Sequence, residues 1–101
     1  MKTLAFAAVT AIALLAGEPA RAQDADPQLL SISCAGCHGT SGHSPGAIPS
    51  IYGRSAASIA ESLRAFRDGK QSATVMNRIA KGYTDTEIDT VAREISTHWK
   101  D

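Results

Sequence analysis

The sequence predicts an all-α fold with three main helices and a short one, and three observations carry this prediction. Apolar residues recur at spacings of three and four in three separate segments. A residue of a type that commonly caps helices precedes each of these segments. No segment alternates apolar and polar residues as a half-buried strand does.

The N-terminus has the pattern of a secretory signal peptide, residues 1–22. A lysine is followed by an uncharged run from Leu4 to Gly17 and then by a small-x-small site that ends at Ala22. The run is shorter than the roughly 20 residues that a membrane-spanning helix needs. An uncleaved anchor or a buried helix is the alternative. We expect cleavage after Ala22, which leaves residues 23–101 as one exported, periplasmic domain with no membrane span.

The composition argues against a nucleic-acid partner. Ten basic residues balance ten acidic ones, so the formal net charge is zero. A domain this short buries a small core and often needs a staple. A bridge between cysteines only three positions apart would constrain the unfolded chain little. The two cysteines are therefore expected to hold something other than each other.

The first helix is expected to begin at Asp26, which can cap it, with Pro27 at its first position. Its apolar face is made by Leu29, Leu30 and Ile32, and the two cysteines lie one turn apart on one side. The segment 39–53 that follows has four glycines and two prolines and no helical period. A long loop in a small domain is usually functional, so this one is expected to wrap around a bound group.

The second helix places apolar residues on one face and stops at Gly69; either Ser58 or, one turn earlier, Ser55 caps it. A helix of one or two turns is predicted between Val75 and Lys81. The last helix begins with the capping box of Thr84 and Glu87. Its apolar residues follow at spacings of three and four: Ile88, Val91, Ile95 and Trp99.

Cys34, Cys37 and His38 form Cys-x-x-Cys-His, the attachment signature of c-type haem. Each cysteine adds through sulfur to one vinyl group, and the histidine becomes the proximal iron ligand. A thioredoxin-like pair normally lies near a βαβ pattern, and a structural zinc site needs four protein ligands. A plain disulfide is the remaining alternative. We expect one covalently bound haem c, which would also supply the core that a short chain lacks.

Met76 is the methionine that remains after cleavage, and its thioether is a soft, neutral ligand for the sixth iron position. The alternative is that it fills core space. His43 lies too close to His38 to reach the far side, and His98 is expected to be exposed. An empty sixth position would favour gas binding or peroxidase chemistry.

The loop supplies a predicted environment for the haem. A ligating histidine usually donates its other N–H to a carbonyl, and Pro49 is the candidate acceptor. The fixed φ of proline would hold this loop still. Ile51 and Tyr52 would then flank the haem edge, where Tyr52 bonds a carboxylate or merely packs.

The order of these motifs resembles a class I cytochrome c. CAGCHG, then PSIYG, then a late methionine and a capped last helix with a terminal aromatic residue follow the family's order between Asp26 and Trp99. The resemblance implies that the first and last helices pack together around one haem. By this analogy, Leu29, Leu30 and Ile32 meet the apolar face of the last helix.

A narrower resemblance is to the cytochrome subunits of flavocytochrome c sulfide dehydrogenase, carried by CAGCHGTSGHS and ATVMNRIAKGYT. In that family the methionine of the second stretch ligates iron, which corresponds to Met76. The resemblance implies an FAD-binding flavoprotein partner that oxidises sulfide and passes electrons to the haem. Many such subunits have two haem domains, whereas this chain has a single motif.

We therefore expect a periplasmic monohaem cytochrome that transfers single electrons as the haem subunit of a sulfide-oxidising complex and catalyses nothing alone. The alternative is a free diffusible carrier that serves an oxidase or another redox partner, including other cytochromes. The basic residues Arg54, Arg64, Arg67 and Lys70 are expected to form a solvated helix face, with a docking patch as the alternative.

Overall fold

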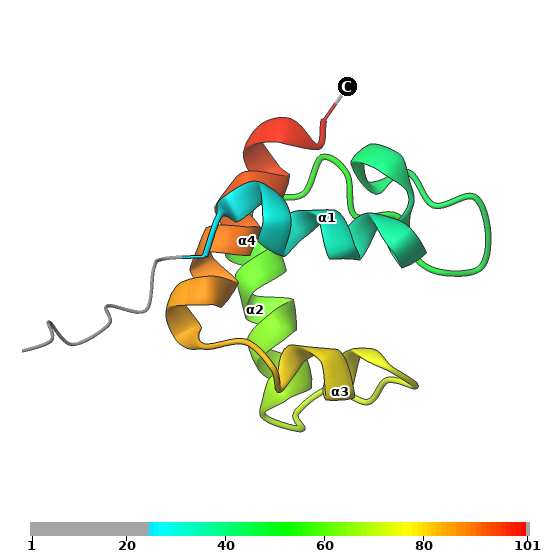
Figure 1. The fold of residues 1–101 in the computed structure, drawn as a ribbon. Helices are drawn as coiled ribbons and strands as arrows, with labels where there is room; N and C mark the ends of the chain where they lie inside the picture. The colour runs from blue at the N-terminus through cyan, green and yellow to red at the C-terminus, as the bar shows by residue number, and fades with distance from the viewer. Residues whose placement is uncertain (1–24, 101) are drawn as a thin grey trace, which may run out of the picture.

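A computed structural model describes residues 25–100, which form four helices and contain no strand. The all-α prediction, with three long helices and one short one, is confirmed (Figure 1). The expected signal peptide, residues 1–22, lies outside the described residues. Within 25–100, no helix is long and apolar enough to cross a membrane. The helices are α1 (Pro27–His38), α2 (Ala56–Arg67), α3 (Met76–Ala80) and α4 (Asp85–His98), with a 3-10 turn at Thr40–Gly42.

Side-chain caps fix where the long helices begin. The Asp26 carboxylate accepts a backbone N–H at 2.8 Å, and proline occupies the first position of α1. Thr84 and Glu87 form the predicted capping box of α4, each accepting from the other's backbone N–H at 3.2 Å. In α2 the cap is Ser55, whose hydroxyl accepts from the Ser58 N–H at 3.1 Å. The second helix therefore begins at Ala56, one turn earlier than a cap at Ser58 would place it.

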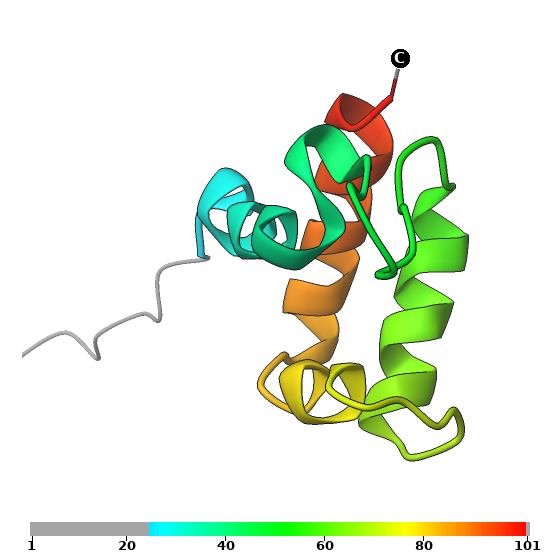
Figure 2. The ribbon, with the colours of Figure 1, turned by 90° about the vertical axis from the view of Figure 1, so that its right-hand side faces the viewer.

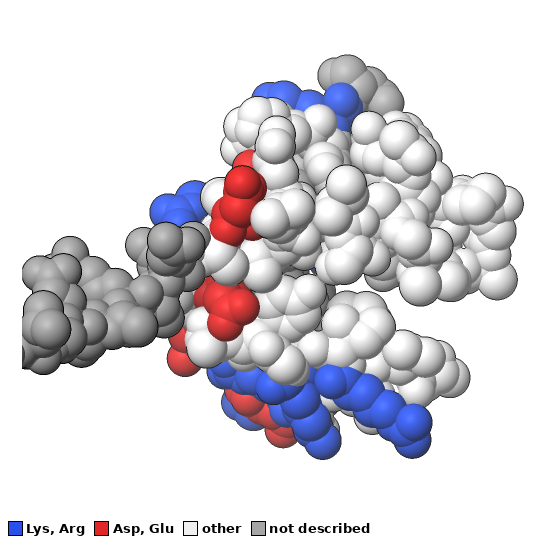
Figure 3. Space-filling view, viewed as in Figure 1, with Lys and Arg blue, Asp and Glu red and all other residues white. Residues whose placement is uncertain are grey.

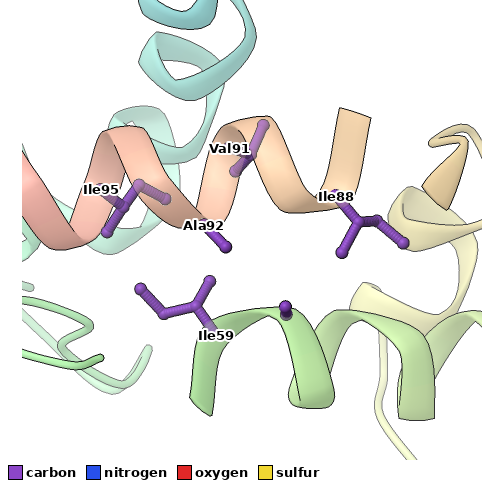
Figure 4. Close-up of a cluster of buried hydrophobic side chains, with 6 residues drawn as sticks. Ile59, Ile88, Val91, Ala92 and Ile95 are labelled. Carbon is purple, nitrogen blue, oxygen red and sulfur yellow. The ribbon is translucent and has the colours of Figure 1, made fainter. Parts of the chain in front are cut away.

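The apolar core lies between α4 and α2. Ile88, Ala92 and Ile95 of α4 extend toward α2, which carries Ile59 (Figure 4). Ile88, Val91 and Ile95 are the largest fully buried side chains, at spacings of three and four along α4. The whole buried cluster consists of Ile59, Ala60, Ile88, Val91, Ala92 and Ile95.

The expected packing of α1 against α4 is correct for Leu30 and wrong for its two apolar neighbours. Leu30 and Cys34 pack against the core, and Ser31 beside them is buried. Leu29 and Ile32 are 70% and 65% exposed. Only one stripe of a helix can face its neighbour, and positions four apart share that stripe. Leu29 and Ile32 lie outside the stripe that Leu30 and Cys34 define.

The space-filling view shows a notch at one side of the molecule (Figure 3). Helices α1 and α2 both pack on α4, and α3 packs on α2, but among the described elements α1 and α3 are not in contact. In Figure 2, α1 lies toward the top and α3 at the bottom, and α2 and α4 run between these two levels. The end of α1 that carries the cysteines and the short helix that carries Met76 are therefore held apart by the α2–α4 pair.

Ion pairs join α2 to α4 beside the core. Arg64 bonds Asp85 at 3.1 Å and Asp89 at 2.9 Å, and Arg67 bonds Asp85 at 2.8 Å and Asp68 at 3.0 Å. Hydrogen bonds from Arg67 and Arg64 lower the pKa of the Asp85 carboxyl. Two of the four basic residues expected on a solvated face are thus tied to aspartates.

Replacing Ile88 with alanine tests the core assignment. Because Ile88 is fully buried between α4 and α2, the I88A variant should lose about 2–5 kcal/mol of unfolding free energy. Chemical unfolding of the purified protein measures this loss, and I88V, with an expected loss of about 0.5–1.5 kcal/mol, serves if I88A does not accumulate. The matched control is L29A, which should stay within about 0.5 kcal/mol of wild type. Equal losses in L29A and I88A would contradict the assignment.

Candidate functional site

The two cysteines and the histidine occupy the last turn of α1. Cys34 is half-buried against the core, whereas Cys37 one turn later is exposed. Both thiols are free, and burial raises the pKa of the Cys34 thiol. The helix is continuous through His38, so the two sulfurs lie on the same side of it, next to the histidine. The predicted spacing therefore places two thiols and one imidazole on the last turn of α1.

His38 is held by the loop that follows it. Its Nδ1 lies 2.6 Å from the Pro49 carbonyl oxygen, the contact expected from the sequence. A carbonyl can only accept, so Nδ1 carries the proton and donates it. The neutral ring then has its lone pair on Nε2. This is the tautomer in which an imidazole can bind a metal ion through Nε2.

A glycine turn brings the loop back to His38. Gly39 has φ +87°, and a Cβ there would lie 1.7 Å from the His43 carbonyl oxygen. Gly42 has φ +79°, and its carbonyl accepts the N–H groups of Ile51 at 2.9 Å and Tyr52 at 3.3 Å. Only glycine fits such positions without strain. The turn therefore carries the chain away from α1 and anchors the segment that presents Pro49.

The two residues expected at the haem edge behave differently. Ile51 packs against the core between the helices. Tyr52 is 40% exposed, and its ring stacks on His43 with the ring centroids 3.8 Å apart. The structure thus brings Pro49 to His38. Ile51 instead packs against the core, and the ring of Tyr52 stacks on His43.

Met76 is the first residue of α3 and is half-buried. It is absent from the buried core cluster, so the alternative of a core-filling methionine gains no support. Asn77 beside it has a buried amide oxygen with no hydrogen-bond partner among the described residues. Since α3 does not contact α1, Met76 and His38 lie on two helices that are apart from each other.

The borders of the notch are apolar and uncharged on the cysteine side. No lysine, arginine, aspartate or glutamate occurs from Pro27 to Gly53. Figure 3 shows this as a white lobe, with a notch between it and the lower lobe that includes α3. Large apolar side chains are exposed on the bordering elements: Leu29 and Ile32 on α1, Ile48 in the loop, and Val75 and Ile79 at α3.

These residues fit a haem by their chemistry. The site offers two free thiols one turn apart, an imidazole with a free Nε2 lone pair, and a methionine thioether on a separate helix. The exposed Val75 and Ile79 at α3 are what a flat apolar group would cover.

The other histidines are placed less well for this site. His98 is largely exposed at the end of α4, with its Nε2 3.6 Å from Glu94. His43 lies in the loop on the same side as His38, stacked on Tyr52. The part of the chain that the structure describes holds no group of three or more His, Cys, Asp or Glu side chains that could bind a metal ion.

A groove on another side of the molecule is separate from this site. It is a groove of about 890 Å³ between α2 and α4, with an alanine floor that includes Ala56, Ala60 and Ala92. Its rim carries Arg64 and Asp89, which pair with each other. No cysteine, histidine or methionine lines it, so it is separate from the site of the motif.

One basic residue has partners that the sequence analysis missed. Arg54 donates to the hydroxyls of Ser58 at 2.7 Å and Ser62 at 3.1 Å. The spacing of four between successive residues places all three on one side when a helix begins at this point. The spacing of four in the sequence indicates this contact between Arg54 and the two serines, whereas the sequence analysis places Arg54 on a solvated face.

Three curated proteins are similar to about two thirds of this chain. The cytochrome subunit of sulfide dehydrogenase from Chlorobaculum tepidum is 54% identical over 65 residues, which are 64% of this chain and 59% of that protein. This chain therefore spans less than two thirds of that relative. No family model matches the chain.

Two further relatives are named as cytochromes c. Cytochrome c-552 of Acidithiobacillus ferridurans is 34% identical over 65 residues, 64% of this chain and 28% of that protein. Cytochrome c-554(548) of Halomonas halodenitrificans is 35% identical over 69 residues, 64% of this chain and 83% of that protein. With the all-α fold and the Cys-x-x-Cys-His motif at residues 34–38, these relatives show that the chain belongs to the cytochrome c family of c-type electron carriers, which implies a covalently bound haem c.

Proposed function

We propose that one haem c is attached through Cys34 and Cys37 and that His38 and Met76 are the two axial iron ligands. The observation that carries the proposal is the 2.6 Å contact of His38 Nδ1 with the Pro49 carbonyl. It leaves Nε2 as the free ligand atom and fixes the ring's orientation. The placement of Met76 on a helix that faces α1 without touching it supports the second ligand.

Each side chain then has a separate task. The two sulfurs form thioethers that keep the group on the chain. His38 is oriented by Pro49, and the neutral Met76 thioether favours ferrous iron and so raises the reduction potential. The apolar side chains Val75 and Ile79 at α3 limit the access of water. The bound haem supplies reversible one-electron chemistry, and the chain supplies ligation, burial and orientation.

The proposed role is to accept single electrons from an FAD-containing sulfide dehydrogenase flavoprotein as its haem subunit. Support comes from the identity of 54% over 65 residues with a protein named as such a subunit. The uncharged lobe with exposed Leu29, Ile32 and Ile48 also suits a lasting apolar interface. Because this chain matches 59% of that relative, the partner is inferred for the shared part.

A free diffusible carrier is the second candidate. The Halomonas cytochrome favours it, since 83% of that protein is matched by a chain with a single Cys-x-x-Cys-His motif. In either case we propose that residues 1–22 direct export and that residues 23–101 function in the periplasm.

Covalent attachment is tested by removing haem that is not bonded to the chain. The exported protein should keep its red colour through acid-acetone treatment and should stain for haem after denaturing electrophoresis. The C37A variant should form at most one thioether, which shifts the pyridine haemochrome band, and S33A serves as its neighbouring control. Colour that washes out of the wild-type protein would overturn the attachment.

The sixth ligand is tested with Met76→Ala. The variant should lose the weak absorbance band of sulfur bound to ferric iron at the red end of the spectrum. Its reduction potential should fall, because a ligand that favours ferrous iron is gone. A matched control is V75A, the exposed neighbour, which should keep the band. An unchanged spectrum in M76A would remove Met76 from the ligand set.

The partner is tested by tagging the chain and purifying it from its native periplasm. A yellow FAD-containing protein should copurify with it, and I32E on the uncharged lobe should reduce the yield of that protein at least tenfold, the effect of about 1.4 kcal/mol. The control A57E places the same charge on the α2 face that borders the alanine groove. Recovery of monomer alone would favour the free carrier.

A further inference from the structure

A pair of hydroxyl groups joins α1 to the turn that follows α3. The Tyr83 phenol oxygen lies 3.5 Å from the Ser33 hydroxyl oxygen, 50 positions away in the chain. The Ser33 hydroxyl donates its one hydrogen to the Leu30 carbonyl at 3.1 Å, so the Tyr83 phenol is the donor to Ser33. A tight hydroxyl pair has its oxygens roughly 2.8 Å apart, and long bonds at binding sites tighten when the bound group is in place. The contact connects two parts of the chain whose helices, α1 and α3, do not pack on each other among the described elements.

Ser33 lies on the side of α1 that carries the thiols. It directly precedes Cys34 and lies one turn before Cys37. Residues four apart on a helix share one side, so Ser33 and Cys37 belong to the same side of α1. The contact with Ser33 therefore places the Tyr83 hydroxyl beside the cysteine motif.

Tyr83 is joined on its other side to the helix that carries Met76. Its backbone N–H donates to the carbonyl of Ala80 at 3.2 Å, and Ala80, the last residue of α3, is fully buried. The Tyr83 ring is half-buried and packs against the core cluster. The hydroxyl therefore reaches α1 from a ring that the core supports.

The segment that carries Met76 has little support of its own. Helix α3 packs on α2, but it has only five residues and no side-chain cap, and so short a helix is not stable by itself. Val75 and Ile79 are 53% and 43% exposed. A contact that fixes the end of α3 relative to α1 therefore limits how far Met76 can move relative to His38.

We propose that the Tyr83 hydroxyl, by donating to Ser33, holds Met76 on the iron against competing ligands. The inference rests on the proposed haem attachment and on Met76 as an axial ligand. A neutral ligand such as imidazole displaces the thioether by forming an iron–nitrogen bond as the iron–sulfur bond breaks, and Met76 must move away for this exchange. The contact between Tyr83 and Ser33 opposes that movement. Both are positioning residues, because they act on the iron through Met76.

The test is a titration of the ferric, haem-loaded protein with imidazole, followed by the loss of the sulfur-to-iron band at the red end of the spectrum. Y83F removes the hydroxyl and keeps the ring that packs on the core. Its dissociation constant for imidazole should fall about two- to tenfold, the effect of one hydrogen bond. S33A should give the same fall, and it carries the test if Y83F does not mature. The double variant S33A/Y83F should fall no further than the single variants, because all three lose one and the same contact.

The matched control is S96A. Ser96 also donates to a helix carbonyl, that of Arg93 at 3.1 Å, but it lies on α4, so S96A should change the dissociation constant less than S33A does. The inference is overturned by an imidazole affinity that does not rise in Y83F and S33A, by effects that multiply in the double variant, or by an equal effect in S96A. A wild-type protein without the sulfur-to-iron band removes the proposed Met76 ligand itself. A normal wild-type band with unchanged variants overturns this inference alone.

Discussion

The constraint on which the structure depends is the narrow core between α4 and α2. Ile88, Val91 and Ile95 are buried on α4, and α2 contributes Ile59 and Ala60, with the half-buried Ala56 and Leu63 beside them. Because α1 packs on α4 and α3 packs on α2, this single pair holds two other helices at a distance from each other. The cysteine-bearing end of α1 and the helix of Met76 are therefore apart because α1 and α3 do not contact each other.

The backbone conformation of the loop after α1 orients the imidazole of His38. The motif fixes two thiols and an imidazole on one turn of α1, but the imidazole needs an orientation as well as a position. Gly39 and Gly42 turn the chain at positive φ, and the returning loop brings the Pro49 carbonyl to His38. Ile51 packs into the core from the same loop, so the loop is anchored at both the site and the interior. The glycine- and proline-rich composition thus lets the loop return and bring the Pro49 carbonyl to His38.

Much of this was predictable from the sequence because the signals are local. Capping residues, apolar spacing and the Cys-x-x-Cys-His motif each act within a few residues, and the resulting helices are confirmed. The failures concern choices that depend on neighbours distant in the chain. Leu29 and Leu30 are equally apolar, and only the position of α4 decides that Leu30 is the one that packs. Nothing in the sequence separates Arg54 from Arg64 and Arg67. In the structure, aspartates on α4 pair with Arg64 and Arg67.

The segregation of charge along the chain has a consequence for encounters with other molecules. From Pro27 to Gly53 the chain carries no charged residue apart from histidine, whereas the α2–α4 side carries both signs and α3 carries Arg78. Added salt screens interactions between exposed charges and leaves apolar contact largely untouched. A partner that binds the uncharged segment from Pro27 to Gly53 should therefore associate at a rate that hardly varies with ionic strength. Such a protein relies on shape and surface fit to find its partner, and long-range steering contributes little to its speed.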